Sequence, residues 1–169
     1  MFDSELPPPI DRTRWRDIAK EVLATGATAR YEFPVLHTFR STLGSELLLI
    51  PVLVCRRFNE VIEITAGARI AMRMAGTEIE GACLVDDDEL RMLIRWSSEP
   101  DGECTNQARP TLARYATLTG LVVEFRSIWQ QSVAEIQVPH GRLVRLTLAE
   151  WKRFREGLRK CVQFWHDTA

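Results

Sequence analysis

Few side chains in this sequence have the types and spacing that catalysis requires. Histidine occurs at positions 37, 140 and 166, and none of these residues belongs to the H-E-x-x-H pattern of zinc enzymes. The glycine-rich phosphate loops and the G-x-S-x-G nucleophile turn are also absent. A general base needs a substrate-side partner, and the sequence identifies none for these histidines. We therefore expect no catalytic residue and predict that the protein is not an enzyme.

Carboxylates and thiols give no clear metal site. The run Asp86-Asp87-Asp88-Glu89 can attract Mg²⁺ or Ca²⁺, but it lacks the alternating ligands and central glycine of a calcium loop. We interpret it as the acidic tip of a hairpin. Cys55, Cys83, Cys104 and Cys161 form no C-x-x-C pair, which predicts reduced structural thiols. We therefore expect neither a metal nor a cofactor.

One set of arginines is expected on the outward face of neighbouring strands, where it would form a basic stripe: Arg69, Arg73, Arg91 and Arg95. Such a stripe can meet phosphates. However, Glu78 and Glu80 alternate in the same way on the strand expected between them. Cross-strand ion pairs would neutralise the stripe, and we prefer this interpretation.

The C-terminal third offers a second set of binding candidates. Residues 105–169 carry ten basic and five acidic side chains, whereas residues 76–104 carry two basic and nine acidic ones. Arg126, Arg142 and Arg145 lie on or beside expected strands, with Trp129 nearby. Proteins that bind single strands combine basic groups for the backbone with aromatic rings for the bases. The alternative is that Trp129 lies in the core and the arginines are solvated.

The elements that position these residues follow from the hydrophobic periods. A helix is expected after a cap at Asp11 or Thr13, with an apolar face from Trp15 to Leu23. A half-buried strand is expected over 29–39, and Pro34 indicates that it either lies at a sheet edge or carries a bulge. A polar stretch over 97–107 is the expected boundary between the two halves, and a short helix is expected over 110–118. The remaining strands are expected over 47–55, 61–64, 69–74, 78–85, 89–96, 121–125, 133–138 and 143–146.

The last quarter of the chain carries the clearest pattern. Thr147 and Glu150 form a capping box, and behind it six apolar residues recur at helical spacing: Trp151, Phe154, Leu158, Cys161, Val162 and Trp165. Charged residues take the other face: Lys152, Arg153, Arg155, Glu156, Arg159 and Lys160. A helix with two tryptophans on one stripe is expected to cover the core.

The segment from Val144 to Trp151, an alternating strand that runs into a capped helix, resembles the strand-to-helix junction of the positive cofactor four family. These domains have a curved four-stranded antiparallel sheet followed by a helix and bind single-stranded DNA as dimers. The resemblance spans about residues 117–166 and has no counterpart in the first hundred residues. It implies that Arg126, Arg142 and Arg145 lie on the binding sheet and that Trp151 packs the helix. The alternative is convergence on a stable helix cap.

These patterns predict an α+β fold: a mostly antiparallel sheet with an N-terminal helix, a short middle helix and a C-terminal amphipathic helix packed on one face. Residues 1–10 are expected to form a flexible arm, and residues 11–169 either one domain or two subdomains, 11–100 and 105–169. We expect a non-enzymatic binding protein that takes single-stranded nucleic acid through Arg126, Trp129, Arg142 and Arg145. The alternative is a protein-interaction module such as a chaperone, an immunity protein or an adaptor. We also expect a homodimer, no membrane-spanning segment and a cytoplasmic location.

Overall fold

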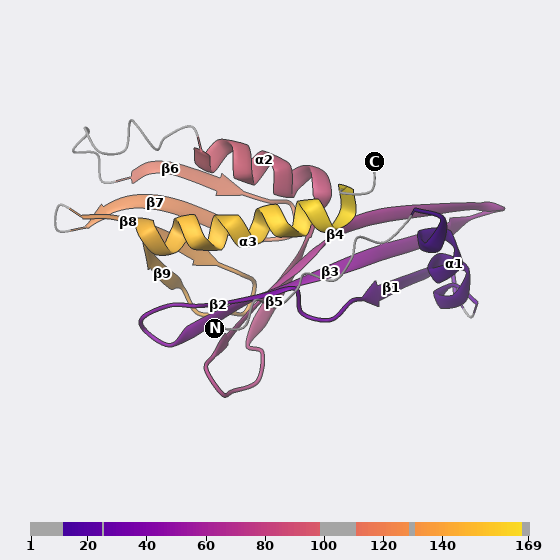
Figure 1. The fold of residues 1–169 in the computed structure, drawn as a ribbon, viewed down its shortest axis with the longest axis horizontal. Coiled ribbons are helices and arrows are strands. Elements are labelled where there is room, and N and C mark those ends of the chain that lie inside the picture. The colour runs from indigo at the N-terminus through magenta and orange to yellow at the C-terminus, as the bar shows by residue number, and fades with distance from the viewer. Residues whose placement is uncertain (1–11, 25, 99–110, 129–130, 167–169) are drawn as a thin grey trace.

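The structure is a computed structural model that describes residues 12–24, 26–98, 111–128 and 131–166 (Figure 1). The predicted arm over 1–10, the helix cap at Asp11 and most of the polar stretch over 97–107 lie outside these residues. The described part confirms an α+β fold with helices near both ends of the chain and two antiparallel sheets. Its elements are, in order, α1 (Arg12–Val22), β1 (Thr28–Glu32), β2 (His37–Arg40), β3 (Ser45–Phe58), β4 (Val61–Met74), β5 (Gly81–Asp86), α2 (Asp87–Ser98), β6 (Thr111–Ala116), β7 (Val122–Ile128), β8 (Gln131–Gln137), β9 (Val144–Thr147) and α3 (Leu148–His166).

Sheet A contains β1 to β5 and is built on one long hairpin. Strands β3 and β4 pair without interruption from Ser45↔Met74 to Phe58↔Val61, and Asn59 turns the chain with a φ of 54°. The separate strands predicted over 61–64 and 69–74 are therefore one strand. β5 pairs with β4, while β1 and β2 both pair with the other edge of β3. The hairpin extends away from sheet B, with α1 and β1 along its outer part and its tip just past α1 (Figure 1).

Two prolines divide the edge of sheet A into β1 and β2. The Pro51 carbonyl accepts a hydrogen bond from the Phe33 amide at 2.9 Å. The nitrogen and the carbonyl of a residue in an antiparallel strand point to the same neighbour, so the Pro51 nitrogen, which carries no hydrogen, also faces the edge strand. Pro34, which also has no N–H, lies opposite in the gap between β1 and β2. Because neither proline can donate to the ladder, the strand predicted over 29–39 is broken there. Of the two alternatives predicted from Pro34, a sheet edge or a bulge, the edge position is the one that the strand order shows.

The strand predicted over 89–96 is wrong, because this segment belongs to helix α2. The Asp86 carboxylate caps the helix by accepting a hydrogen bond from the Glu89 amide at 2.8 Å, and the acidic first turn suits the positive end of the helix dipole. The acidic run is therefore a helix start and not a hairpin tip. Leu90 and Leu93 are buried whereas Met92 is 57% exposed, which follows the helical period.

The short helix predicted over 110–118 is also wrong. Residues 111–116 form β6, the first strand of sheet B, whose order is β6-β7-β8-β9. Tyr115 lies against Trp96 of α2, with ring centroids 5.4 Å apart. The middle helix of the fold is thus α2, and it precedes the boundary stretch instead of following it.

Helix α3 lies over both sheets and closes the main core, as the pattern predicts (Figure 1). The capping box is confirmed: the Glu150 amide donates to Thr147 Oγ1 and the Thr147 amide donates to Glu150 Oε1, both at 3.1 Å. One outward prediction fails, because Arg155 is only 7% exposed. It donates a hydrogen bond from Nη1 to the Ser97 carbonyl at 2.8 Å and so ties α3 to the end of α2.

A second apolar cluster lies where α1 and the last turn of α3 meet the long hairpin. Trp165 packs edge-on against Trp15 at 5.1 Å between centroids, and its indole donates to the Gly67 carbonyl at 3.0 Å. Ile18, Leu23 and other buried side chains complete this cluster. Both tryptophans of α3, Trp151 and Trp165, are thus buried as predicted.

Candidate binding surfaces

The outer face of sheet B carries two of the predicted site residues, Arg126 on β7 and Arg145 on β9. The strand register places Arg114, Glu124, Glu135 and Arg145 in one row across the four strands. Side chains of adjacent strands on one face stand close enough to interact. The structure therefore brings these arginines together, but with two carboxylates between them.

These arginines are all held in ion pairs. Arg126 lies 2.7 Å from Glu124 and 3.1 Å from Glu135; Arg145 lies 2.9 Å from Glu135, and Arg114 lies 3.1 Å from Glu124. The hydrogen bond to Glu124 and the charges of both carboxylates raise the pKa of Arg126. A phosphate on this face would therefore have to compete with Glu135, whose side chain is 5% exposed and held on both sides.

The other predicted site residues do not join this row. Arg142 precedes β9 and pairs with Glu80, at 3.3 Å, at the junction of the two sheets. Trp129 lies outside the residues that the structure describes.

The basic stripe expected from Arg69, Arg73, Arg91 and Arg95 does not form, because Arg91 and Arg95 belong to α2. The carboxylates expected to neutralise it, Glu78 and Glu80, precede β5. Other carboxylates take their place: Arg69 pairs with Glu32 at 3.6 Å, Arg73 with Glu46 at 3.1 Å and Arg91 with Asp87 at 3.2 Å.

A different surface stands out on sheet A, on the face opposite the helices. In β3 the side chains that point to this face are apolar, from Leu48 to Val54, and Ala71, Ala82 and Leu84 join them from β4 and β5. No side chain of the described helices belongs to this cluster. Leu48, Ile50, Val52 and Ala71 are buried, whereas Val54, Ala82 and Leu84 are only partly buried. A face of an antiparallel sheet without helices usually presents polar residues, so this apolar floor needs an explanation.

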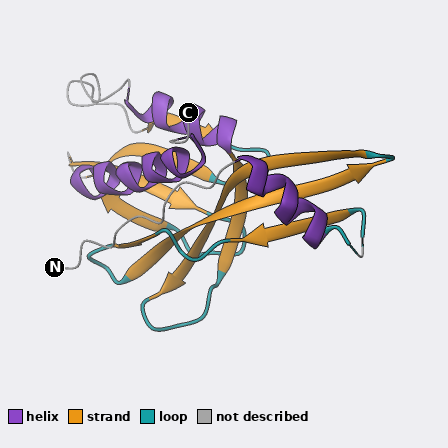
Figure 2. Ribbon diagram, turned by 45° about the vertical axis from the view of Figure 1, so that its right-hand side comes forward, coloured by secondary structure: helices purple, strands orange, loops and turns teal. Residues whose placement is uncertain are grey.

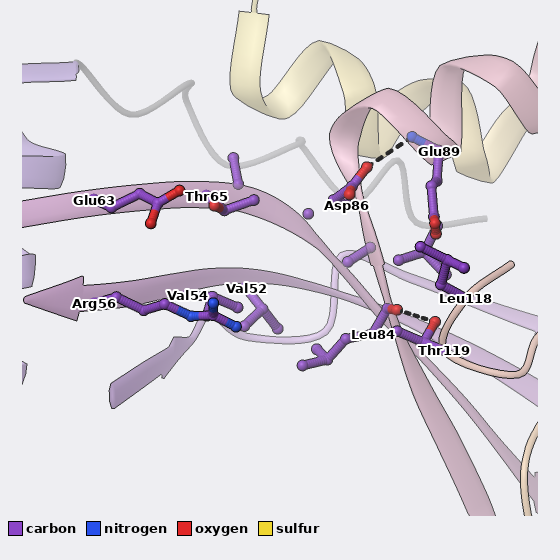
Figure 3. Close-up of a pocket in the computed structure, with 14 residues that line it drawn as sticks. Val52, Val54, Arg56, Glu63, Thr65, Leu84, Asp86, Glu89, Leu118 and Thr119 are labelled. Atoms are coloured by element: carbon purple, nitrogen blue, oxygen red, sulfur yellow. Dashed lines mark hydrogen bonds between the residues drawn. The ribbon is translucent and has the colours of Figure 1, made fainter. Parts of the chain in front are cut away.

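This floor is hollowed at the β5 side (Figure 3). A hollow of about 320 Å³ lies over Val52, Val54 and Leu84, and the turn before β7 overhangs it. In this turn Thr119 donates a hydrogen bond to the Leu84 carbonyl, while Leu118 is 98% exposed. A leucine that stands free in solvent beside an apolar hollow is typical of a contact surface.

Two further hollows continue this one towards β1 through Val54, Arg56 and Leu84. We call the three together the sheet A groove. Arg30 lines its β1 end, and Asp86 and Glu89 line its α2 end (Figure 3). The groove therefore has an apolar centre, a cationic end and an acidic end.

Both carboxylates of the acidic end make contacts within the protein. Burial and the neighbouring Asp86 raise the pKa of Glu89, while a hydrogen bond from the Leu118 backbone opposes this shift. Asp86 is engaged as the cap of α2. The two carboxylates thus stabilise the local structure at the α2 end of the groove, and they also give this end negative charge.

The described residues give no sign of catalytic chemistry in the groove. No three His, Cys, Asp or Glu side chains among them come together as metal ligands. Burial raises the pKa of Cys83 and Cys161 to about 12, with Glu89 adding to the effect at Cys83, so these thiols stay protonated.

No helix in the described part of the chain is long and apolar enough to cross a membrane.

Comparison with protein-family models, with curated proteins and with solved structures gave no match. Sequence reasoning missed the sheet A groove, although one signal was present. Every residue from Leu47 to Val54 is apolar, so both faces of this strand are apolar. Such a pattern predicts a strand that is covered on both faces.

Proposed function

We propose that this protein is a non-enzymatic protein-binding module that takes an extended segment of a partner protein in the sheet A groove. The observation that carries the proposal is the apolar hollow on a sheet face with no described helix over it, with Leu118 exposed at its rim. Burial of such surface is the main driving force of protein association.

The charges of the groove define the partner segment. Arg30, at the β1 end, has no ion-pair partner among the described residues, whereas the opposite end holds Asp86 and Glu89. Arg56 and Glu63, which lie opposite each other on β3 and β4, line the hollow between these ends. From β1 to β5 the groove crosses three strand spacings, or about 14 Å, which about four residues of an extended chain span. The segment therefore has two or more apolar residues, a carboxylate at one end and a basic residue at the other.

A displayed library of random peptides tests this proposal, because the groove itself selects the segments that fit it. The wild-type protein should enrich apolar peptides with charges of opposite sign at their ends. The variant V54D/L118S should weaken their binding at least about tenfold, about 1.4 kcal/mol, as measured by fluorescence anisotropy. Leu43→Ser is the matched control, because Leu43 is 74% exposed in a different turn. Failure to enrich peptides above background, or equal binding by V54D/L118S, would refute the proposal.

Single-stranded nucleic-acid binding by sheet B is the second candidate. Arg114, Arg126 and Arg145 share one exposed face and outnumber the two carboxylates between them. If this face binds phosphates, affinity for a labelled single-stranded oligonucleotide should fall steeply with salt. Glu135→Gln, which releases Arg145 and leaves Arg126 paired with Glu124 alone, should then raise the affinity. Absence of binding at low salt would remove this candidate.

A stacking role of Trp129, a homodimer and a cytoplasmic location stay predictions from the sequence. Sedimentation velocity over a tenfold range of concentration tests the dimer. In the oligonucleotide assay, Trp129→Ala should weaken binding if the ring stacks on a base, whereas unchanged affinity in a folded variant would exclude the stacking role.

A further inference from the structure

A second cleft lies on the other side of the molecule, between strand β2 and helix α3. It has a volume of about 390 Å³ and is lined by His37, Arg40, Arg153, Glu156 and Lys160, with Thr38 and Phe39. Arg153 and Lys160 are two helical turns apart on α3 and therefore lie on the same face. Most residues that line the cleft have polar or charged side chains, and the cleft does not continue the sheet A groove.

Helix α3 approaches His37 closely at Gly157. A Cβ atom at position 157 would lie 2.5 Å from His37 Cδ2 and 3.1 Å from Nε2. The glycine thus lets the imidazole lie directly against the helix, between the turns that carry Arg153 and Lys160. His37 is half-buried there, and burial, followed by the charge of Lys160, lowers its pKa.

The cations around the cleft exceed the carboxylates. Glu156, the carboxylate that lines the cleft, is engaged by Arg159. It meets three cationic side chains in and beside the cleft: Arg153, Arg159 and Lys160. Arg40 pairs instead with Glu46, whose side chain points to the other face of sheet A. Neither Arg153 nor Lys160 has an ion pair among the described residues.

We propose that the cleft between β2 and α3 binds a small oxyanion of the phosphate type, held by Arg153, Lys160 and His37. Guanidinium and ammonium groups provide charge and donors for such an ion. The imidazole adds a donor from one ring nitrogen, and it gains a proton when the anion offsets the charge of Lys160. This site is independent of the protein-binding groove, so its test can fail while the other succeeds.

Proton NMR of the His37 ring measures this site directly. In the wild-type protein, millimolar inorganic phosphate should raise the pKa of His37 by about one unit above its value in sodium chloride of equal ionic strength. The variant R153A/K160A should lose this phosphate-specific difference. Lys152→Ala, on the same helix but outside the cleft, should retain it. His166, which pairs with Asp87, is the internal reference and should show no such difference.

A parallel titration with phosphoserine distinguishes a free ion from a phosphate carried on a larger molecule. A phosphate-specific shift with either probe, lost in R153A/K160A, supports the site. Equal shifts in phosphate and chloride would show that only screening acts, and would overturn it. A shift that survives in R153A/K160A would also overturn it, because the anion would then bind elsewhere.

Discussion

Gly157 lies in the interior of α3, where glycine costs about 1 kcal/mol of helix stability relative to alanine. The structure gives the reason, since a Cβ atom here would meet both His37 Cδ2, at 2.5 Å, and Leu49 Cδ1, at 3.0 Å. Leu49 is fully buried and cannot move aside easily. Close packing of the helix on β2 and β3 therefore overrides helix propensity at this residue.

We expect Gly157→Ala to destabilise the protein by about 1–3 kcal/mol, as overpacking does, although alanine favours a helix. The double variant H37A/G157A should recover part of this loss, because the smaller side chain at position 37 makes room. Urea unfolding of the wild type and the three variants measures the coupling free energy. Strictly additive effects would contradict the contact.

Arg155 is a buried residue on the face of α3 that the sequence pattern predicts to be exposed. Its place among charged neighbours predicts a solvent-facing side chain, yet it is buried and bonds the Ser97 carbonyl. A carbonyl of the last helical turn lacks an intrahelical partner, and Arg155 satisfies the one at Ser97.

Arg155→Met should therefore cost about 1.5–3 kcal/mol, the usual value of a hydrogen bond to a charged group, and loosen the end of α2. Thermal unfolding by circular dichroism measures the loss. Arg153→Met on the exposed side of the same helix is the control and should change stability by less than about 0.5 kcal/mol. Equal effects of the two substitutions would exclude the structural role of Arg155.

At the scale of elements, the capping box of α3 does more than start a helix. Glu150 Oε1 accepts from the Thr147 amide, and Oε2 accepts from the Thr42 amide at 3.0 Å. Thr42 lies in the turn between β2 and β3, so one buried carboxylate joins the helix start to sheet A.

Thr147→Ala should cost about 1 kcal/mol, as the loss of an N-cap does. Glu150→Ala should cost distinctly more, because it leaves two backbone donors without their acceptor. The free energy of unfolding in urea measures both. A Glu150→Ala variant no less stable than Thr147→Ala would show that the bond to Thr42 contributes nothing.

Glu46 links three neighbouring strands. It is buried on β3 and pairs with Arg40 of β2 and Arg73 of β4. Burial acts to raise its pKa, but the hydrogen bonds and charges of the two arginines outweigh this and lower the pKa below its ordinary value of 4.5.

Because the folded-state pKa of Glu46 is lowered, its contribution to stability is present above pH 4.5 and is lost as the pH falls through the folded-state value. Glu46→Gln should therefore be less stable than the wild type near pH 7, by about 1.5–3 kcal/mol. The difference should shrink between about pH 5 and pH 3. Urea unfolding across this range measures it, and a constant difference would contradict the ion pairs.

At the scale of the molecule, the two sheets share one core. Side chains of sheet A, sheet B, α2 and α3 form a single buried cluster, and the cluster under α1 joins it through α3. The two views of the ribbon show α3 along sheet B and α1 across the long hairpin (Figures 1 and 2). Because the two sheets and the helices share one core, we expect them to unfold together in a single transition.

Leu53→Ala, under α1, and Ile136→Ala, in sheet B, should each cost about 2–5 kcal/mol and shift the same single transition. Tryptophan fluorescence and far-ultraviolet circular dichroism, followed in urea, should give coincident curves for both variants. If the halves are separate subdomains, each substitution will shift only one of two transitions.

The sequence pattern predicted helices and strands correctly where one face of the element is apolar and the other is polar. This holds for α1, β7, β8 and α3, whose stripes match the buried faces. It fails for α2, because Leu90, Met92, Ile94 and Trp96 alternate like a strand, while Leu90 and Leu93 also fit a helix. Packing of Leu90 and Leu93 in the main core is compatible with the helix alone.

The sequence by itself determined the fold class, the closing helix and its cap, since these depend on neighbours within a few residues. Only the tertiary structure decided which arginines are engaged and on which face of sheet A the groove lies. Those facts depend on strand register, which joins Arg126 to Glu135 and Arg40 to Glu46. They also depend on which sheet face the helices cover, and no local pattern encodes that choice.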